Sequence, residues 1–204
     1  MQVLLTGAFG NIGQNALAEL LSQGHTVRCL DIPSKANRRT ARRYRDRAEL
    51  CWGDIRRAED VAQAVAGCDV VIHLAAIIPP LSEARPEWAT GINVEGTRTL
   101  VSAMLAQPTP PRLIFASSVS VFGPPEGVRD PRRASDPVQA TDNYTHHKIA
   151  CEQLIRASGL TWTILRLGVV PPIRLGRIDP VLFNVSLDSL LEYVNTRDVG
   201  LALA

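Results

Sequence analysis

Two side chains that could exchange protons lie four positions apart in the second half of the chain. Tyr144 and Lys148 begin and end the stretch Tyr-Thr-His-His-Lys, and this spacing puts both on one face of a helix. An ammonium stabilises a neighbouring phenolate, so we expect Lys148 to lower the phenol pKa from its usual value of about 10. Ser118 ends an apolar stretch, where its hydroxyl could reach the same substrate oxygen. The three groups suit reversible oxidation of a secondary alcohol, and the alternative is a solvated Tyr and Lys on a helix surface.

The histidines and cysteines carry no sign of a metal site. His146 and His147 lie inside the same stretch, but Tyr144 and Lys148 already use the inward face of the helix, so we expect both histidines at the surface. The cysteines lack the paired spacing of zinc ligands or of a disulfide framework. We therefore expect no metal and four buried thiols, at Cys29, Cys51, Cys68 and Cys151.

A glycine turn at the start of the chain could hold the hydride acceptor. Gly7, Gly10 and Gly13 follow the apolar run Val3 to Leu5, and a helical pattern then runs on to Gly24. In a dinucleotide site the first glycine makes the turn, the second lets a pyrophosphate approach the backbone, and the third lets helix and sheet pack closely. The positive end of the helix dipole then faces the phosphates. A simple loop between strand and helix is the alternative.

An acid at the end of the next apolar run indicates which dinucleotide is bound. Thr26 to Leu30 reads as a strand, and Asp31 ends it. A carboxylate there can accept both adenosine ribose hydroxyls but repels a 2′-phosphate, which favours NAD over NADP. Asp31 could instead be a turn residue, and Arg38 or Arg39 could reach a 2′-phosphate and make NADP the cofactor.

Composition describes an ordinary globular domain. The chain has 204 residues, 46% hydrophobic and 21% charged, with a formal charge of +2. Residues 35–57 carry nine basic and three acidic side chains, which we interpret as a solvated helix. The two aromatic residues among them, Tyr44 and Trp52, are too few for the stacking platform that binding of single-stranded nucleic acid requires. No stretch is long and apolar enough to span a membrane, and Met1 leads directly into a strand. We therefore expect a cytoplasmic protein without nucleic-acid or membrane partners.

Apolar strand patterns alternate with helical ones along most of the chain. Strands are expected over 26–30, 49–52, 69–76, 112–118 and 161–167, with helices over 38–48, 58–66, 90–107 and 142–158. This order requires right-handed crossovers and predicts an α/β fold with a doubly wound parallel sheet, a Rossmann fold. Residues 119–141 are rich in Pro and Gly and are expected to form a long functional loop.

Together these motifs resemble the extended short-chain dehydrogenase/reductase family, in its NAD-dependent epimerase/dehydratase branch. The resemblance covers residues 1–170 and lies in Thr6-Gly-Ala-Phe-Gly-Asn-Ile-Gly13, Gly53-Asp54, His73-Leu-Ala-Ala76, Asn93-Val-Glu-Gly-Thr97, Ser117-Ser-Val-Ser-Val-Phe-Gly123 and Tyr144-x-x-x-Lys148. It implies Tyr144 as acid/base, Lys148 on the nicotinamide ribose and Ser118 on the substrate oxygen. The cofactor-binding residues that it implies are Gly7, Phe9, Gly10, Asn11, Ile12, Gly13, Asp31, Asp54, Ile55, Leu74, Ala75, Ala76, Asn93, Tyr144 and Lys148.

The resemblance weakens towards its end, after Arg166. Arg166 is followed by Leu-Gly-Val-Val-Pro-Pro rather than by the family's Asn-Val-Tyr-Gly-Pro-like turn, and Asp198 matches an acid that caps a helix in the family. Members commonly continue for about a hundred residues more. We therefore expect a dinucleotide-binding domain over 1–168 and a small, truncated C-terminal substrate lobe over 169–204. The family often dimerises through the two helices that begin here near Gly91 and Asn143.

Three functions remain open on the sequence alone. The first is an NAD-dependent oxidoreductase or epimerase acting on a secondary hydroxyl of a sugar or nucleotide sugar, working as a homodimer. The second is an NAD(P)H-dependent carbonyl reductase. The third, of another class, is a non-catalytic NAD-binding sensor or scaffold protein. The catalytic triplet favours an enzyme, whereas the short C-terminal lobe favours the third reading.

Overall fold

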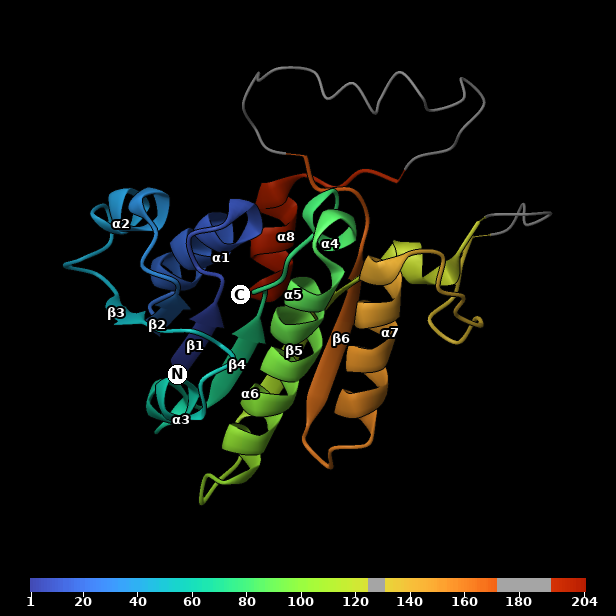
Figure 1. The fold of residues 1–204 in the computed structure, drawn as a ribbon. Coiled ribbons are helices and arrows are strands. Elements are labelled where there is room, and N and C mark those ends of the chain that lie inside the picture. Colours follow the sequence, from blue (N-terminus) through green and yellow to red (C-terminus); the bar gives the residue numbers. More distant parts are fainter. Residues whose placement is uncertain (125–130, 172–191) are drawn as a thin grey trace.

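The computed structural model describes residues 1–124, 131–171 and 192–204. Six parallel strands form one sheet in the order β3-β2-β1-β4-β5-β6. Helices cover both of its faces (Figure 1). The predicted doubly wound Rossmann fold is therefore confirmed. The strands are β1 (Gln2–Thr6), β2 (Thr26–Asp31), β3 (Glu49–Trp52), β4 (Val70–His73), β5 (Arg112–Ser118) and β6 (Trp162–Leu167).

Alternation along the strands divides the core between the two faces. In β1, Leu4 points to the face covered by α3 (Ala58–Val65), α6 (Gly96–Leu105) and α7 (Asn143–Arg156). Its neighbours Val3 and Leu5 point to the face covered by α1 (Asn11–Ser22), α2 (Lys35–Ala41) and α8 (Thr196–Leu203). Because successive side chains of a strand point to opposite faces, a continuous apolar run is what a strand buried on both sides requires.

The glycine turn fixes how α1 leaves the sheet. Gly7 has a φ of 68°, and a Cβ there would lie 2.8 Å from the backbone nitrogen of Ala75. A Cβ on Gly13 would overlap the carbonyl oxygen of Gly7. The close approach of α1 to the sheet therefore depends on the first and third glycines, as the spacing predicts.

One helix differs in form from the prediction over 90–107. The chain forms α4 (Leu81–Ala84) and α5 (Pro86–Thr90), passes through a π-helical turn over Gly91–Glu95, and continues as α6. Within this turn the Asn93 carbonyl accepts hydrogen bonds from the Thr97 hydroxyl, at 2.6 Å, and from the Cys151 thiol, at 3.1 Å. Periodicity does not reveal such a turn, because the extra residue is accommodated by contacts from another helix.

Four other local expectations need correction. The strand predicted over 69–76 begins at Val70 and ends at His73. The helix predicted over 38–48 begins at Lys35 and ends at Ala41, with turns beyond it. A short 3₁₀ helix, Val119–Phe122, opens the segment expected to be irregular throughout. Asn195, rather than Asp198, caps α8 by accepting a hydrogen bond from the backbone of Arg197.

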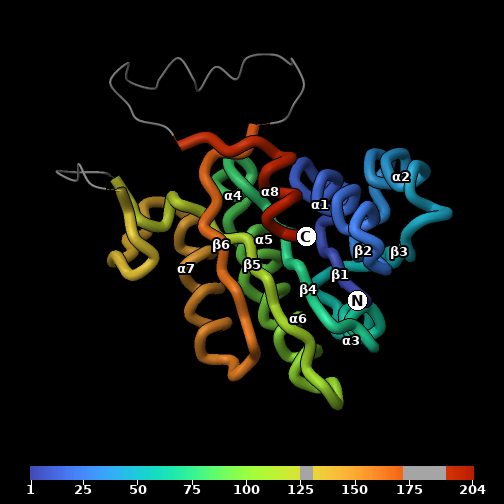
Figure 2. The backbone as a smooth tube through the Cα atoms, turned by 180° about the vertical axis from the view of Figure 1, so that it is seen from behind, coloured from blue at the N-terminus to red at the C-terminus, as the bar shows by residue number. Residues whose placement is uncertain are grey.

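The described end of the chain packs on the Rossmann sheet. Val199 and Leu203 of α8 join the core formed by α1, and a Cβ on Gly200 would lie 3.1 Å from the backbone of Asn15. Figure 2 shows α8 beside α1 from behind. Before α8, Val169 and Tyr193 form a single parallel bridge that follows β6. The boundary at residue 168 stays a prediction, and most of the expected lobe lies outside the described residues.

Candidate active site

Two cavities meet at the glycine turn, on the edge where the parallel strands end. The first has a volume of about 320 Å³ and the second about 350 Å³. Both are lined by Gly7, Gly10, Leu74 and Ala76, so the turn and the segment after β4 form the ridge between them. A dinucleotide has two halves joined by a pyrophosphate, and this arrangement offers two hollows joined by a glycine-lined backbone.

Asp31 lies in the first cavity with its carboxylate held by three donors. The backbone N–H of Phe9 reaches one oxygen at 3.0 Å, while the backbone of Ile32 and the side-chain amide of Asn37 reach the other at 2.8 and 2.9 Å. Burial raises the carboxyl pKa, and the two backbone hydrogen bonds oppose that rise. Asn37 was not among the predicted site residues, because its role depends on how α2 packs rather than on any motif.

The far end of the first cavity is lined by the segment after β3. Asp54 lies there as expected, but Arg56 binds its carboxylate through two guanidinium nitrogens, and this pair holds the Asp54 carboxyl pKa below its usual value. Ile55 is 7% exposed, and Trp88 and Ile92 complete the wall. The sequence places Asp54 and Ile55 here, whereas Trp88 and Ile92 reach the cavity only through the packing of α5 and the π turn.

Phe9 supports this cavity from behind. It is 4% exposed, does not line either cavity, and packs its ring 5.5 Å from that of Trp52. The Arg38 guanidinium lies 5.1 Å from the centre of the Trp52 ring and donates to the Pro33 carbonyl. Phe9 therefore contacts Asp31 only through its backbone N–H. Arg38 lies against the ring of Trp52.

The second cavity brings together the three predicted catalytic residues. Ser118 comes from the end of β5, and Tyr144 and Lys148 come from the first two turns of α7. The Lys148 ammonium donates to the Ala116 carbonyl at 2.7 Å and lies 4.7 Å from the centre of the Phe115 ring. Asn11, Ile12 and Gly13 line the side of the cavity formed by α1.

The protonation states differ from the prediction. Burial lowers the pKa of Lys148 to about 8. Burial also raises the pKa of the Tyr144 phenol, and a hydrogen bond with Ser118 opposes that rise only in part. The expectation that Lys148 lowers the phenol pKa is therefore wrong for this geometry, because spacing defines a shared helix face and not how deeply it is buried.

Two carboxylates fix the start of α7. Asp142 caps the helix and accepts from the Thr145 backbone at 2.7 Å, while the Thr145 hydroxyl returns a hydrogen bond to the cap. Glu83, from α4, accepts from the backbone nitrogens of Asn143 and Tyr144. Carboxylates at a helix N-terminus are favoured by its dipole, so both contacts stabilise the turn that carries Tyr144.

A buried ion pair lies behind Ser118. Glu152 is 4% exposed and accepts from the Ser117 hydroxyl at 2.6 Å and from the Arg166 guanidinium at 2.9 and 2.7 Å. Arg166 also lies 4.6 Å from the centre of the Phe122 ring. These contacts join α7, the ends of β5 and β6, and the 3₁₀ turn. Glu152 was not predicted, although it follows Lys148 by one helical turn.

Asn93 contacts the cavity wall rather than the cavity itself. Its side chain accepts from the Ile77 N–H at 2.7 Å and donates to the Ile77 carbonyl at 2.8 Å, and it lines neither cavity. His147 contacts the same amide at 3.2 Å and is only 5% exposed. The expectation of two surface histidines is therefore wrong for His147, because α7 is packed on more than one side, and confirmed for the exposed His146.

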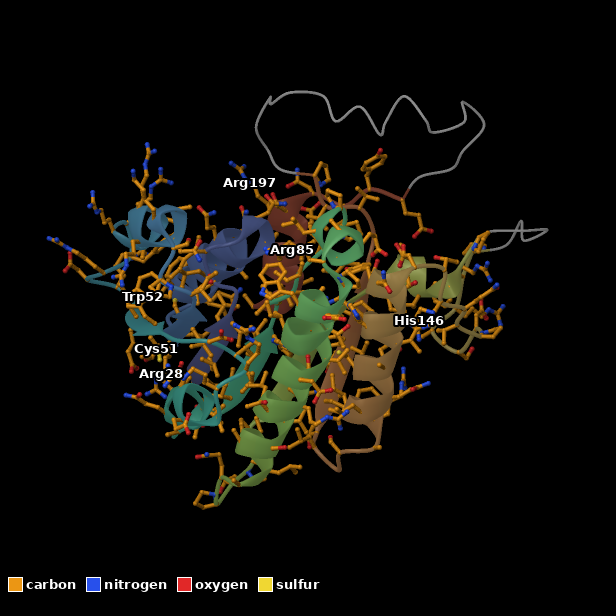
Figure 3. The ribbon with its side chains drawn as sticks, in the orientation of Figure 1. Arg28, Cys51, Trp52, Arg85, His146 and Arg197 are labelled. Atoms are coloured by element: carbon orange, nitrogen blue, oxygen red, sulfur yellow. The ribbon has the colours of Figure 1, made fainter. Side chains whose placement is uncertain are left out.

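Within the described ranges, no group of three or more metal-ligating side chains is close enough to hold a metal ion. The same ranges contain no helix with the length and hydropathy needed to cross a membrane. The four cysteines are free; three are buried as predicted, and Cys51 is half-buried at the edge of the sheet beside Trp52 (Figure 3).

Comparison with known proteins agrees with this geometry. The chain is 31% identical to a 3-beta-hydroxysteroid dehydrogenase of Mycolicibacterium neoaurum over 93% of its length and 52% of that protein. It is 32% identical to a UDP-glucose 4-epimerase of Corynebacterium glutamicum over 81% of its length and 50% of that protein. It therefore spans about half the length of these curated relatives.

Solved structures and a family model give the same result. A UDP-glucose 4-epimerase from Thermus thermophilus, solved in complex with NAD, aligns with 99% of this chain and 73% of its own, at a TM-score of 0.80 and 26% identity. The model of the NAD dependent epimerase/dehydratase family matches residues 3–170, which include the glycine turn, both cavities and the catalytic triplet. The chain belongs to the NAD-dependent epimerase/dehydratase family.

Proposed function

We propose that this chain binds NAD and carries the catalytic residues of an oxidoreductase or epimerase that acts on a secondary hydroxyl. One observation carries the proposal: Ser118, Tyr144 and Lys148 line a cavity that is separated only by a glycine-lined ridge from a second cavity containing Asp31. A Cβ on Gly13 would overlap the Gly7 carbonyl oxygen, so this glycine lets α1 begin close to the sheet, while Gly10 lines both cavities where a pyrophosphate would lie. NAD supplies the hydride acceptor.

The residues of this chain handle the proton. In the oxidation direction Tyr144 would take the substrate hydroxyl proton, while Ser118 holds the same oxygen by a hydrogen bond. In the reverse direction Tyr144 would return the proton to a carbonyl oxygen. Burial raises the pKa of the Tyr144 phenol and so favours the protonated form, which donates to a carbonyl oxygen. This supports the carbonyl reductase as a second candidate.

NAD is the cofactor that the first cavity supports better. The Asp31 carboxylate lines that cavity, and its negative charge opposes a 2′-phosphate. Arg38, the residue that would favour NADP, donates to the Pro33 carbonyl and lies against Trp52. We therefore propose NAD, with NADP as the alternative.

The substrate class rests on the described part of the second cavity. Relatives named as UDP-glucose 4-epimerases support a sugar or nucleotide sugar, which we propose first. Ile78, Leu167 and Val170 give the cavity an apolar side, which supports a second candidate, an apolar ring alcohol such as a hydroxysteroid. We also propose a cytoplasmic homodimer. Its interface would be formed by α7 and by α6 together with the π turn that precedes it.

A substrate panel tests the proposal. The wild-type chain and Tyr144→Phe are assayed for NADH formation with free sugars, UDP-sugars and hydroxysteroids, and for NADH oxidation with the matching ketones. Epimerisation of the UDP-sugars is followed by chromatography, because it leaves no net NADH. We expect turnover only in the wild type, with NAD affinity unchanged within about twofold, because the phenol hydroxyl moves a proton without carrying the dinucleotide. Equal turnover in both proteins would remove Tyr144 as acid/base. Binding of NAD without turnover on any substrate would favour the sensor or scaffold.

A further inference from the structure

The imidazole of His147 has one protonation state that its neighbours permit. Its Nε2 lies 2.8 Å from the Thr90 hydroxyl, and that hydroxyl donates its single proton to the Pro86 carbonyl, also at 2.8 Å. The Thr90 oxygen must therefore accept, so His147 Nε2 carries a hydrogen. This contact alone leaves the other ring nitrogen, Nδ1, either free or protonated.

Asn93 decides the state of Nδ1. Its amide orientation is fixed by the Ile77 backbone, because the N–H of Ile77 must face the amide oxygen and the Ile77 carbonyl must face the amide nitrogen. The amide nitrogen is therefore the atom that lies 3.2 Å from His147 Nδ1. Since an amide nitrogen only donates, Nδ1 must accept, and the imidazole is neutral.

The Asn93 amide holds residues 77–78, which form the wall between the two cavities. Ile77 lines the first cavity and Ile78 lines the second. Both follow Leu74 and Ala76, which line both cavities. Asn93 fixes this segment by bonding both the N–H and the carbonyl of Ile77. A proton on Nδ1 would direct an N–H at the amide nitrogen of Asn93, so one of the two donors would have to turn away.

We propose that His147 is a positioning residue that keeps the Asn93 amide bonded to Ile77, so that the wall between the cavities is in place while the imidazole is neutral. This inference concerns the arrangement of the site and rests on the proposed function only in its cofactor readout. Burial is the largest effect on the imidazole and lowers its pKa. The charges of Glu83 and Asp142 oppose that fall, whereas those of His146 and Lys148 add to it.

Two variants separate the hydrogen bond from the fold. His147→Asn places a carbonyl oxygen near the position of Nδ1, so it keeps an acceptor for Asn93 but cannot titrate. His147→Leu fills the site without an acceptor. His146→Asn is the matched control, because His146 is the neighbouring residue on α7 and is exposed (Figure 3).

Hydrogen exchange measured by mass spectrometry reports how well the backbone amides of residues 74–81 are protected. It requires no cofactor. At pH 7.5 we expect similar protection in wild type, His147→Asn and His146→Asn, and roughly tenfold faster exchange at Ile77 in His147→Leu. Equal protection in wild type and His147→Leu, with both folded by circular dichroism, would overturn the proposal.

NADH affinity then gives a pH profile. Burial lowers the imidazole pKa from its usual value of about 6.5. Between pH 7.5 and pH 5.5 we therefore expect the affinity of the wild type to fall more than that of His147→Asn, by no more than about tenfold, while His146→Asn follows the wild type. Parallel profiles in wild type and His147→Asn would also overturn it. A wild type that binds no dinucleotide at any pH would contradict the proposed function, and the exchange experiment would still decide the role of His147.

Discussion

Replacing Glu152 by alanine removes the shared acceptor of a buried network, and the size of the effect follows from its contacts. The carboxylate is 4% exposed and accepts from Ser117 and twice from Arg166. Removing one partner of a buried ion pair leaves the other charge uncompensated, which costs about 3–5 kcal/mol. Arg156, whose side chain is 46% exposed, adds less than about 1 kcal/mol.

This loss should be visible in thermal unfolding. For a chain of this size, about 3–5 kcal/mol corresponds to a fall in Tm of roughly 6–20 °C. Differential scanning calorimetry and urea titration followed by circular dichroism measure both quantities. The matched control is Glu95→Ala, because Glu95 pairs with Arg98 at the surface, with side chains 56% and 58% exposed, and should cost no more than about 1 kcal/mol.

The acid dependence gives a second test of the same network. Burial raises the Glu152 carboxyl pKa, but the hydrogen bonds from Arg166 and Ser117 outweigh it, and the pKa lies below 4.5. A carboxyl with a lowered folded pKa stabilises the fold above its unfolded pKa and loses this contribution as pH falls through the folded value. Wild type should therefore lose its advantage over Glu152→Gln below pH 4.5. An alanine variant as stable as the Glu95→Ala control would refute the reasoning.

Three further substitutions probe the cavities. Gly7→Ala should abolish dinucleotide binding and lower Tm by several degrees, because its Cβ meets the Ala75 backbone. Gly24→Ala, also at positive φ but with open space around it, should only lower Tm. Isothermal titration with NAD distinguishes the two variants, and NAD binding by Gly7→Ala would contradict a dinucleotide site at the glycine turn. Asp31→Ala should weaken NAD at least about tenfold more than NADP, and equal losses in parallel titrations would argue against a ribose contact. Lys148 has a pKa of about 8 in the folded state and near 10.5 in the unfolded state, so the folded state holds fewer protons between these pH values. The free energy of unfolding of the wild type should therefore rise from pH 8 to pH 10.5 relative to that of Lys148→Met. Urea titrations that show parallel pH dependence in the two proteins would rule out the lowered pKa.

Elements whose stability depends on local pattern were predictable from the sequence. β3 and β5 begin and end at the predicted residues, because each is a short apolar run between turn residues. The glycine turn and the acid after it were also found, since each of those positions has a steric or electrostatic requirement that few residue types meet. The sequence also predicted that Ser118 and Tyr144 reach the same substrate oxygen, and the two side chains do line one cavity.

Features that depend on contacts between distant elements were not predictable. The π turn at Asn93 requires Cys151 and His147 from another helix, and no periodicity encodes those contacts. Asn37 reaches Asp31 only because α2 begins three residues earlier than expected. The phenol pKa was predicted in the wrong direction because sequence spacing reports which groups are neighbours, whereas burial, the larger effect here, is a property of the packed fold.

The helix α7 connects these observations, because it supports the second cavity from three directions. Tyr144 and Lys148 face the cavity, His147 faces the wall over Ile77 through Asn93, and Glu152 faces the ends of β5 and β6 through Arg166. The latter two contacts use different partners on different strands and loops, so loss of one leaves the other in place. Their variants should therefore give additive losses of stability within about 0.5 kcal/mol, since coupling is expected only between residues that share partners. A double variant of His147→Leu and Glu152→Gln measures this, and strong coupling would mean that α7 moves as one rigid unit when either contact is lost.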